Sequence, residues 1–214
     1  MSEPAATSAR LVMTVVIVLL VNVMQLRAAP SEENKVANVE EGLTKGTTSE
    51  GAELIGAPAP EFKNLNWMNK SEPLSIRNLR GKVVLIRFWL GDCELCAGSA
   101  PALNYLYSKY HDRGLTVIGV HHPKSSEAKK EEFVVRNVRK LGFEFPIAID
   151  NSWSTIDQYW LGKRKRSFTS ASFLVDKHGL IRWIHPGGVL AMDESPTSAF
   201  TQLTSLIVKL LDEK

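Results

Sequence analysis

The sequence predicts a mixed α/β domain, in which a sheet carries helices on both faces, behind an N-terminal extension. Short apolar, β-branched runs alternate with stretches of helical periodicity, which is the pattern of this fold class. The first run, KVVLIRFWL at residues 82–90, is nearly continuously apolar, as expected for a central strand buried on both faces. Residues 56–214 are sufficient for one core, and 44% hydrophobic with 23% charged residues excludes a largely disordered chain.

Residues 1–29 predict a signal peptide or an N-terminal membrane anchor. The apolar run from Leu11 to Leu26 follows the positive charge of Arg10 and is interrupted only by Thr14, Asn22 and Gln25. Its length lies between the roughly 7–15 residues of a signal-peptide core and the ~20 of a membrane-spanning helix. A buried core helix is the third interpretation. We expect the rest of the chain to be delivered across a membrane.

Residues 30–53 are expected to form a flexible acidic linker to a single domain at residues 54–214. The linker has few apolar and no aromatic side chains, so it cannot bury enough surface to offset its ordering entropy. Residues 1–29 carry a net charge of +1 and residues 30–55 a net charge of −4, so the remainder carries +6 against a total of +3. A charge this mild does not indicate a nucleic-acid partner.

The elements of the domain follow in order. Strands are expected at residues 82–90, 115–120, 145–149, 171–175 and 180–184. The last two strands flank Lys177-His178-Gly179, a hairpin-like turn. Helices are expected at residues 97–111, 126–141 and 193–211. Asp193 or Ser195 can cap the last helix, with Pro196 in its first turn.

Both cysteines of the chain lie in one motif, Cys93-Glu94-Leu95-Cys96, directly after the first strand. Cys93 is expected just outside the following helix, where unpaired backbone N–H groups and the helix dipole favour a thiolate. Cys96 comes one turn later, within reach for a disulfide. A thiolate that attacks a disulfide and a thiol that resolves the mixed disulfide suffice for redox exchange. We therefore predict that Cys93 attacks, that Cys96 is buried and resolves, and that alkylation goes to Cys93 first.

Other interpretations of the motif are an inert pair of thiols and a metal-handling module for copper or zinc. Two thiolates leave tetrahedral zinc two ligands short, although His121 and His122 end the second strand and could approach. We predict no metal and no cofactor. Glu94 is either a proton acceptor or a solvated residue of the first helical turn. The basic run at residues 163–166 is either a solvated loop or a rim that attracts acidic clients.

The segments GKVVLIRFWLGDCELC, LTVIGVHHPK and SFLVDKHGLIRW, with Pro101 five residues after Cys96, resemble a thioredoxin-like fold. More narrowly, they are similar to the TlpA/ResA-like (redoxin) envelope thiol–disulfide oxidoreductases. The opening GAPAPEFKNLNWMN resembles the N-terminal β-hairpin of that group. The resemblance implies an exported or membrane-anchored domain on the non-cytosolic face. Such a domain exchanges a redox-active disulfide with client proteins and with an upstream redox partner. Peroxide reduction is disfavoured, since Leu90 stands where a peroxiredoxin has Thr.

Four positions depart from the pattern of that family. Asp92 replaces the Trp before the first cysteine, Leu95 replaces the Pro between the cysteines, and Ser99 stands where a reductive subgroup has Glu. Ser170 replaces the cis-proline that faces the motif. Because a non-proline cis bond costs about 2.5–4 kcal/mol, we expect a trans bond before Ser170. Ser170 is thus a candidate accessory residue, and slow reduction of a generic disulfide is expected of the natural sequence.

Overall fold

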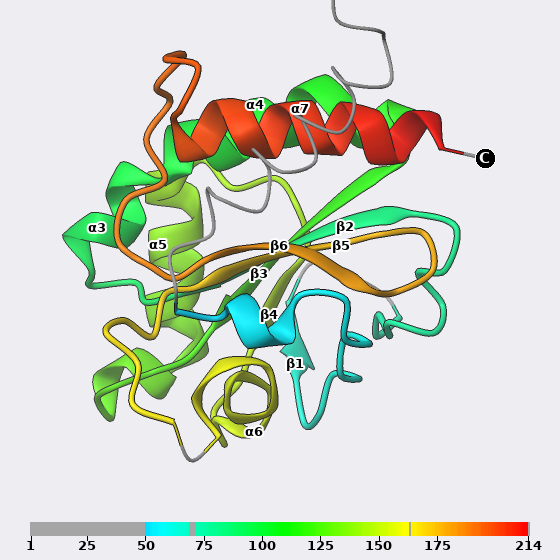
Figure 1. Cartoon of the computed structure of the whole chain (residues 1–214). Coiled ribbons are helices and arrows are strands. Elements are labelled where there is room, and N and C mark those ends of the chain that lie inside the picture. The colour runs from blue at the N-terminus through cyan, green and yellow to red at the C-terminus, as the bar shows by residue number, and fades with distance from the viewer. Residues whose placement is uncertain (1–49, 69–71, 163, 214) are drawn as a thin grey trace, which may run out of the picture. The chain divides into compact units, whose positions relative to one another are not determined.

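A six-stranded mixed sheet organises the domain, with helices on both faces (Figure 1). The computed structural model describes residues 50–68, 72–162 and 164–213. The strand order is β1-β4-β3-β2-β5-β6. The strands are β1 (Asn66–Trp67), β2 (Val83–Trp89), β3 (Leu115–His121), β4 (Ile147–Ile149), β5 (Ser172–Val175) and β6 (Ile181–His185). The five strands expected from the sequence are therefore all present.

Strand β2 lies at the centre and is buried along its whole length. It pairs parallel with β3 and antiparallel with β5. Strand β4 pairs parallel with β3, and β6 pairs antiparallel with β5 after the predicted turn. In that turn Gly179 has a φ of 73°, a conformation that glycine adopts without steric cost. The buried centre explains why residues 82–90 are almost uniformly apolar.

Alternate side chains of β2 enter two separate hydrophobic cores, because successive residues of a strand point to opposite faces. Leu85 and Trp89 belong to the core under α4, α5 and α7, whereas Ile86 and Phe88 belong to the core under α6 and η4. The helices are α3 (Glu94–Gly98), α4 (Ala100–Tyr110), α5 (Glu131–Leu141), α6 (Ser154–Ile156), α7 (Ala199–Asp212) and the π-helical turn η4 (Asp157–Leu161). Three short 3₁₀ turns are η1 (Ala52–Leu54), η2 (His111–Arg113) and η3 (Glu127–Lys129).

The helix expected at residues 97–111 is two helices. Ser99 ends α3 and begins α4, and its hydroxyl donates to the Leu95 carbonyl at 3.1 Å. Pro101 follows in the first turn of α4 and has no N–H to continue the hydrogen-bond ladder of α3. The last helix is also shorter than expected. It begins at Ala199, and its cap is Ser198 rather than Asp193 or Ser195, since the Ser198 hydroxyl accepts from the Thr201 N–H at 3.0 Å.

The N-terminal part of the domain pairs with both edges of the sheet, where the sequence predicted a β-hairpin. Strand β1 pairs antiparallel with β4, and Pro58 forms an isolated bridge with Leu180. The described domain also begins earlier than residue 54. Glu50 accepts a hydrogen bond from the Ser167 N–H at 2.8 Å, and η1 follows directly. These contacts join residues that are between 81 and 122 positions apart in the chain, which local sequence patterns do not reveal.

The apolar run at 11–26 and the linker up to residue 49 lie outside the described residues. The expectation of a leader and of a flexible linker therefore stays a prediction. Within the part of the chain that the structure describes, no helix has both the length and the apolar character that crossing a membrane requires.

Candidate active site

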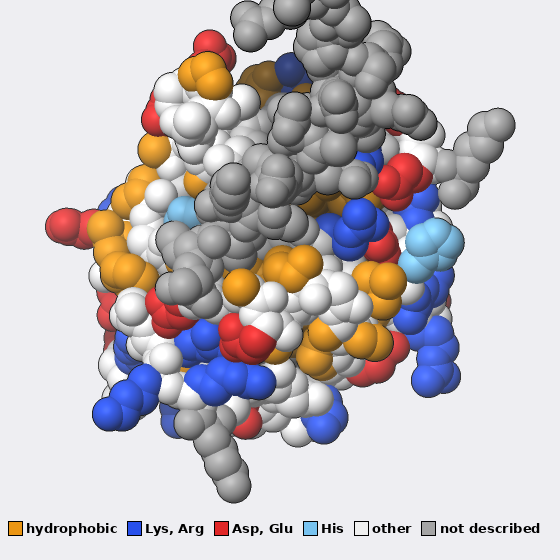
Figure 2. Space-filling view, viewed as in Figure 1, with side chains coloured by type: hydrophobic (Ala, Val, Ile, Leu, Met, Phe, Trp, Pro, Cys, Tyr) orange, Lys and Arg blue, Asp and Glu red, His pale blue; other side chains and the backbone are white. Residues whose placement is uncertain are grey.

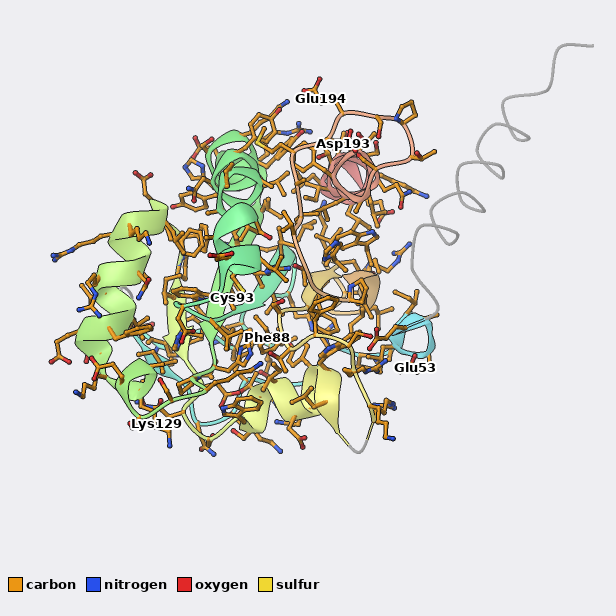
Figure 3. All side chains as sticks on the ribbon, turned by 90° about the vertical axis from the view of Figure 1, so that its left-hand side faces the viewer. Glu53, Phe88, Cys93, Lys129, Asp193 and Glu194 are labelled. Carbon is orange, nitrogen blue, oxygen red and sulfur yellow. The ribbon has the colours of Figure 1, made fainter. Side chains whose placement is uncertain are left out.

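The residues singled out from the sequence gather at one end of the sheet, where the central strands β2 and β3 end. Strands β2 and β3 run parallel and end side by side. Cys93 follows the end of β2, and His121 is the last residue of β3, so both lie where these two strands end. The Phe88 N–H donates to the Ala171 carbonyl at 2.9 Å, which brings the adjacent Ser170 to this end too. Ser170 is buried, and the bond before it is trans. The topology thus unites segments that are far apart in the sequence, and Figure 3 shows Cys93 at the start of the helix that follows β2.

Cys93 is the N-cap of α3, with an extended backbone at φ −105° and ψ 114°. Its sulfur accepts a hydrogen bond from the Cys96 N–H at 3.4 Å, so a backbone donor of the first helical turn points at it. Cys93 is half-buried and Cys96 is buried, and both are free thiols. A donor aimed at the more exposed sulfur stabilises negative charge on that sulfur.

The second sulfur lies in a different environment. Cys96 is 2% exposed. Burial raises the pKa of Cys96 to about 11, against the opposing effects of a hydrogen bond from the Leu90 backbone and the charge of Arg87. A buried thiol with a high pKa reacts slowly with reagents in solution. The geometry therefore supports the predicted order, in which Cys93 is alkylated before Cys96.

The remaining residues around the motif point outward. Asp92, Glu94 and Leu95 are exposed, and Leu95 keeps 42% of its surface accessible. Glu94 lies in the first turn of α3, where a carboxylate is favourable toward the helix dipole. This position fits the solvated interpretation of Glu94 as well as it fits proton transfer.

The two histidines predicted at the end of β3 are buried and neutral. Burial lowers the pKa of His121 to about 4 and that of His122 to about 3. Neither ring nitrogen of His121 has a hydrogen-bond partner among the described residues. The Nε2 atom of His122 lies 2.9 Å from the Thr169 hydroxyl, so His122 ties β3 to the loop before Ser170. Both therefore act here as packed strand-end residues.

The sequence analysis missed Arg87, a charged side chain in the middle of β2 with only 1% of its surface exposed. Its guanidinium donates to the hydroxyls of Ser172 and Ser99, each at 3.1 Å, and to the Gly188 carbonyl at 2.8 Å. Its Nε has no partner among the described residues. Burial lowers the pKa of Arg87, while the charges of Cys96 and Cys93 act in the opposite direction. Apart from Lys82 at its start, Arg87 is the only charged residue of KVVLIRFWL, a signal that could have drawn attention to it.

The hydroxyl of Ser99 connects Arg87 to the cysteine helix. It accepts from Arg87 and from the Leu190 N–H at 2.9 Å, and it donates to Leu95. These three bonds use both acceptor positions and the only donor of a hydroxyl group. Strand β2, helix α3 and the segment after β6 are thereby joined at one buried oxygen.

Comparison with known proteins assigns the chain to a family. The model of the AhpC/TSA family matches residues 55–184, more than half of the chain. The chain belongs to the AhpC/TSA family. The thiol-disulfide oxidoreductase ResA of Halalkalibacterium halodurans is 33% identical over 135 residues, which are 63% of this chain and 69% of that protein. Protein DipZ of Mycobacterium tuberculosis is 38% identical over 132 residues, which are 60% of this chain but only 18% of DipZ.

Solved structures of proteins named for thiol–disulfide exchange have a similar fold. A putative thiol:disulfide interchange protein DsbE from Chlorobium tepidum superposes with a TM-score of 0.57 at 25% identity and covers 73% of this chain and 97% of that one. A thiol-disulfide isomerase from Corynebacterium glutamicum gives 0.58 at 26% identity, covering 73% and 98%. The predicted thioredoxin-like fold and the resemblance to the ResA-like thiol–disulfide oxidoreductases are confirmed.

Two residues of the basic run of this AhpC/TSA family member, Arg164 and Arg166, share one carboxylate, that of Glu53. Lys165 is exposed and forms no ion pair within the part of the chain that the structure describes. Arg166 lies 2.6 Å and Arg164 lies 3.4 Å from the Glu53 carboxylate, while Lys163 is outside the described residues. The Arg166 guanidinium also stacks over the Trp160 ring, 3.9 Å from its centroid. Figure 2 shows acidic and basic side chains next to each other on the face that carries η1. The described part of the run is thus only partly ion-paired and keeps a net positive charge, so the solvated-loop and basic-rim interpretations both stay open.

The motif was also considered for metal binding. Among the residues that the structure describes, no group of three or more His, Cys, Asp or Glu side chains is placed to hold an ion. Cys93 and Cys96 are two sulfur ligands, whereas a structural zinc site uses four ligands.

Proposed function

We propose that this AhpC/TSA family member is an exported or membrane-tethered oxidoreductase that exchanges a Cys93/Cys96 dithiol for a disulfide in client proteins. One observation carries the proposal: a half-buried Cys93, with a backbone N–H directed at its sulfur, precedes a buried Cys96 by one helical turn. The ResA relatives that it resembles are named thiol-disulfide oxidoreductases. Together they indicate an attacking and a resolving sulfur.

The exchange proceeds in two balanced steps. The Cys93 thiolate attacks one sulfur of a client disulfide, forms a mixed disulfide and releases the other client sulfur as a thiolate. The Cys96 sulfur, after losing its proton, then attacks Cys93 and displaces the second client sulfur. The client gains two electrons and two protons, and the cysteine pair becomes a disulfide. An upstream dithiol partner returns the pair to the reduced state, and the same steps in reverse oxidise a client dithiol.

Ser170 is proposed as an accessory residue, because it is buried at the same end of the sheet as the cysteines. Replacing Ser170 by Pro restores the residue of the family pattern at the segment that leads into β5. We expect Ser170→Pro to increase the rate at which the domain reduces a generic disulfide such as that of insulin. A rate that equals that of an ordinary thioredoxin before the change, and stays unchanged after it, would remove Ser170 from the site.

Trapping of clients tests the proposed roles of the two sulfurs. The full chain with Cys96→Ser should accumulate mixed disulfides with client proteins, visible on non-reducing gels and released by dithiothreitol. The matched control Cys93→Ser also retains one thiol, but that thiol is the buried one, so we expect no adducts. Equal adducts from the two variants, or none from either, would contradict the assignment.

The proposed location is the non-cytosolic face, where disulfides persist. Because residues 50–53 already belong to the domain, a coiled linker would cover residues 30–49 and span roughly 22–27 Å, which gives the domain room to meet clients near a membrane surface. A reporter enzyme fused after Lys214 tests this location. Activity confined to the cytosol would overturn it, and activity on the other side of the membrane is expected.

A further inference from the structure

Arg87 is a buried charge for which the described residues offer no fixed counter-ion. Its three hydrogen bonds go to neutral oxygens, those of Ser172, Ser99 and Gly188. None of the ion pairs formed within residues 50–68, 72–162 and 164–213 includes it. A buried charge without a partner is strongly unfavourable, so a guanidinium at 1% exposure calls for an anion close by.

The face to which Arg87 points identifies the groups that can supply that anion. Arg87 alternates with Leu85 and Trp89 along β2, and both of these neighbours pack in the same core as Cys96. Through Ser99 the guanidinium is bonded to the residue that ends the cysteine helix, and the Ser99 N–H itself donates to the Cys96 carbonyl at 3.1 Å. Arg87 therefore lies on the same face of the sheet as Cys96, close enough for the charges of the two groups to act on each other.

The other titratable groups near Arg87 cannot balance its charge. Burial, with the charge of Arg87 as a smaller cause, lowers the pKa of His185 on β6 to about 4. Burial, with smaller effects of His121, Lys124 and Arg87, lowers the pKa of His122 after β3 to about 3. A histidine is neutral or positive, never negative. Cys96 and Cys93 are the acidic groups whose charges act on Arg87. Of the two, only Cys96 is buried with it.

We propose that Arg87 is a positioning residue for the resolving step, a fixed positive charge that faces the Cys96 sulfur at the moment this sulfur carries negative charge. The proposal rests on the function proposed above. When Cys96 releases its proton, the thiolate is stabilised by the guanidinium. When the thiolate then attacks Cys93 and the client sulfur departs, that departing sulfur takes up a proton, so charge leaves the buried site with the client. Arg87 transfers no proton, since it stays charged throughout.

The positive charge of Arg87 opposes the effect of burial on the ionisation of Cys96. Burial alone makes a thiolate at Cys96 costly, and the net pKa of about 11 already includes the favourable effect of Arg87. Attack requires the thiolate, so the rate of resolution follows the fraction of Cys96 that is ionised. Removing the positive charge lowers this fraction at every pH below the pKa.

A purely structural role for Arg87 is the competing explanation, since it also holds Ser99, Ser172 and Gly188 together. Substitutions that keep or remove the charge separate the two roles. Arg87→Lys keeps a charge but has a different donor geometry. Arg87→Gln keeps N–H donors without charge, and Arg87→Met fills the space with apolar atoms, a replacement that buried ionic sites often tolerate.

The experiment uses the full chain with Cys93→Ser, in which Cys96 is the only thiol. The rate at which uncharged methyl methanethiosulfonate modifies Cys96 is measured against pH, with circular dichroism as the check on folding. We expect Arg87→Gln and Arg87→Met to lower the rate at least tenfold at a given pH, and Arg87→Lys to retain most of it. Arg166→Met is the matched control and should leave the rate unchanged, because Arg166 is paired with Glu53, which Figure 3 shows well apart from Cys93.

The outcomes are separable from the fate of the proposed function, because this reaction involves no client. An unchanged rate in a folded neutral variant would overturn the inference. So would an equal loss of rate in Arg87→Lys and Arg87→Gln, since that pattern follows geometry rather than charge. If one neutral variant fails to fold, the other carries the comparison. If the trapping experiment fails while the dependence on charge is found, Arg87 keeps its role toward Cys96 and the client exchange is refuted.

Discussion

Two arginines of this protein occupy nearly buried positions, and their surroundings differ in kind. The Arg166 side chain is 4% exposed, yet it has a carboxylate at 2.6 Å, a carbonyl of Trp160 at 2.9 Å and an aromatic ring beneath it. Arg87 has hydroxyl and carbonyl oxygens around it and no carboxylate among the described residues. The first region, Glu53 with Arg166 and Trp160, is balanced as long as Glu53 is ionised. The second, behind the cysteines, reaches balance only when a sulfur ionises.

The comparison shows that a charge can be held in a protein for two different purposes. A permanent pair at the surface contributes modest stability and little else. A buried charge without a permanent partner costs stability, and such features concentrate where chemistry takes place. His121, at the same end of the sheet, is a neutral counterpart: it is buried, and neither ring nitrogen has a hydrogen-bond partner among the described residues. The following predictions test this division between a balanced and an unbalanced region.

The largest expected effect is on activity. Cys93→Ser removes the attacking sulfur, so we expect disulfide reduction by the isolated enzyme to fall to the uncatalysed rate, with the fold retained. Insulin reduction followed by turbidity measures it. Glu53→Gln, in the balanced region, serves as the control and should keep nearly full activity. If Cys93→Ser were active and Glu53→Gln inactive, the two regions would have been assigned the wrong way round.

The largest effect on stability is expected in the balanced region. Trp160 is fully buried, donates to the Phe168 carbonyl at 2.7 Å and supports the Arg166 guanidinium. Trp160→Ala should lower the free energy of unfolding by about 3–5 kcal/mol, the usual cost of truncating a large buried aromatic side chain. Urea denaturation measures the loss. Trp67→Ala, at the half-buried edge strand, should cost clearly less, and an equal cost would show that Trp160 is not a central support.

The unbalanced region should be the first to respond to acid. Burial lowers the pKa of His121 to about 4, whereas an unfolded histidine titrates near 6.5. The contribution of neutral His121 to the free energy of unfolding is therefore fully present above pH 6.5. It is lost as the pH drops toward 4, because the histidine of the unfolded chain binds a proton first. His121→Leu should reduce the loss between pH 7 and pH 4 by on the order of 2 kcal/mol. The exposed His178→Leu is the control, and an identical acid response in the two variants would contradict the expectation.

The smallest effect on stability is expected from Glu53→Gln, and it should disappear at low pH. Burial raises the pKa of Glu53, but the hydrogen bond and charge of Arg166 outweigh burial, so the net pKa lies below 4.5. The pair thus contributes above about pH 4.5, and its contribution is lost as the pH falls through the lowered pKa. Because the Glu53 side chain is 43% exposed, we expect less than about 1 kcal/mol at neutral pH. Thermal unfolding at pH 6 and pH 3 checks it, and a larger loss at pH 3 than at pH 6 would contradict it.

The central strands and the cysteine helix could be predicted from the sequence because their signals are local. The continuous apolar run predicts β2. The placement of the two cysteines directly after this run predicts that they lie at the start of the next helix. The surroundings of Arg87 have no local signal, since its partners Ser172 and Gly188 lie 85 and 101 residues further along the chain. The same holds for β1, whose pairing with β4 replaces the expected hairpin. Periodicity indicates which face is buried but not which polar groups meet there.

The shared hydroxyl of Ser99 limits which substitutions its hydrogen-bond partners can accept. Positions 87, 99 and 172 are coupled, because a change at one of them leaves a buried donor or acceptor unsatisfied at another. Ser99→Glu would supply the guanidinium with a permanent counter-ion and withdraw it from the sulfur.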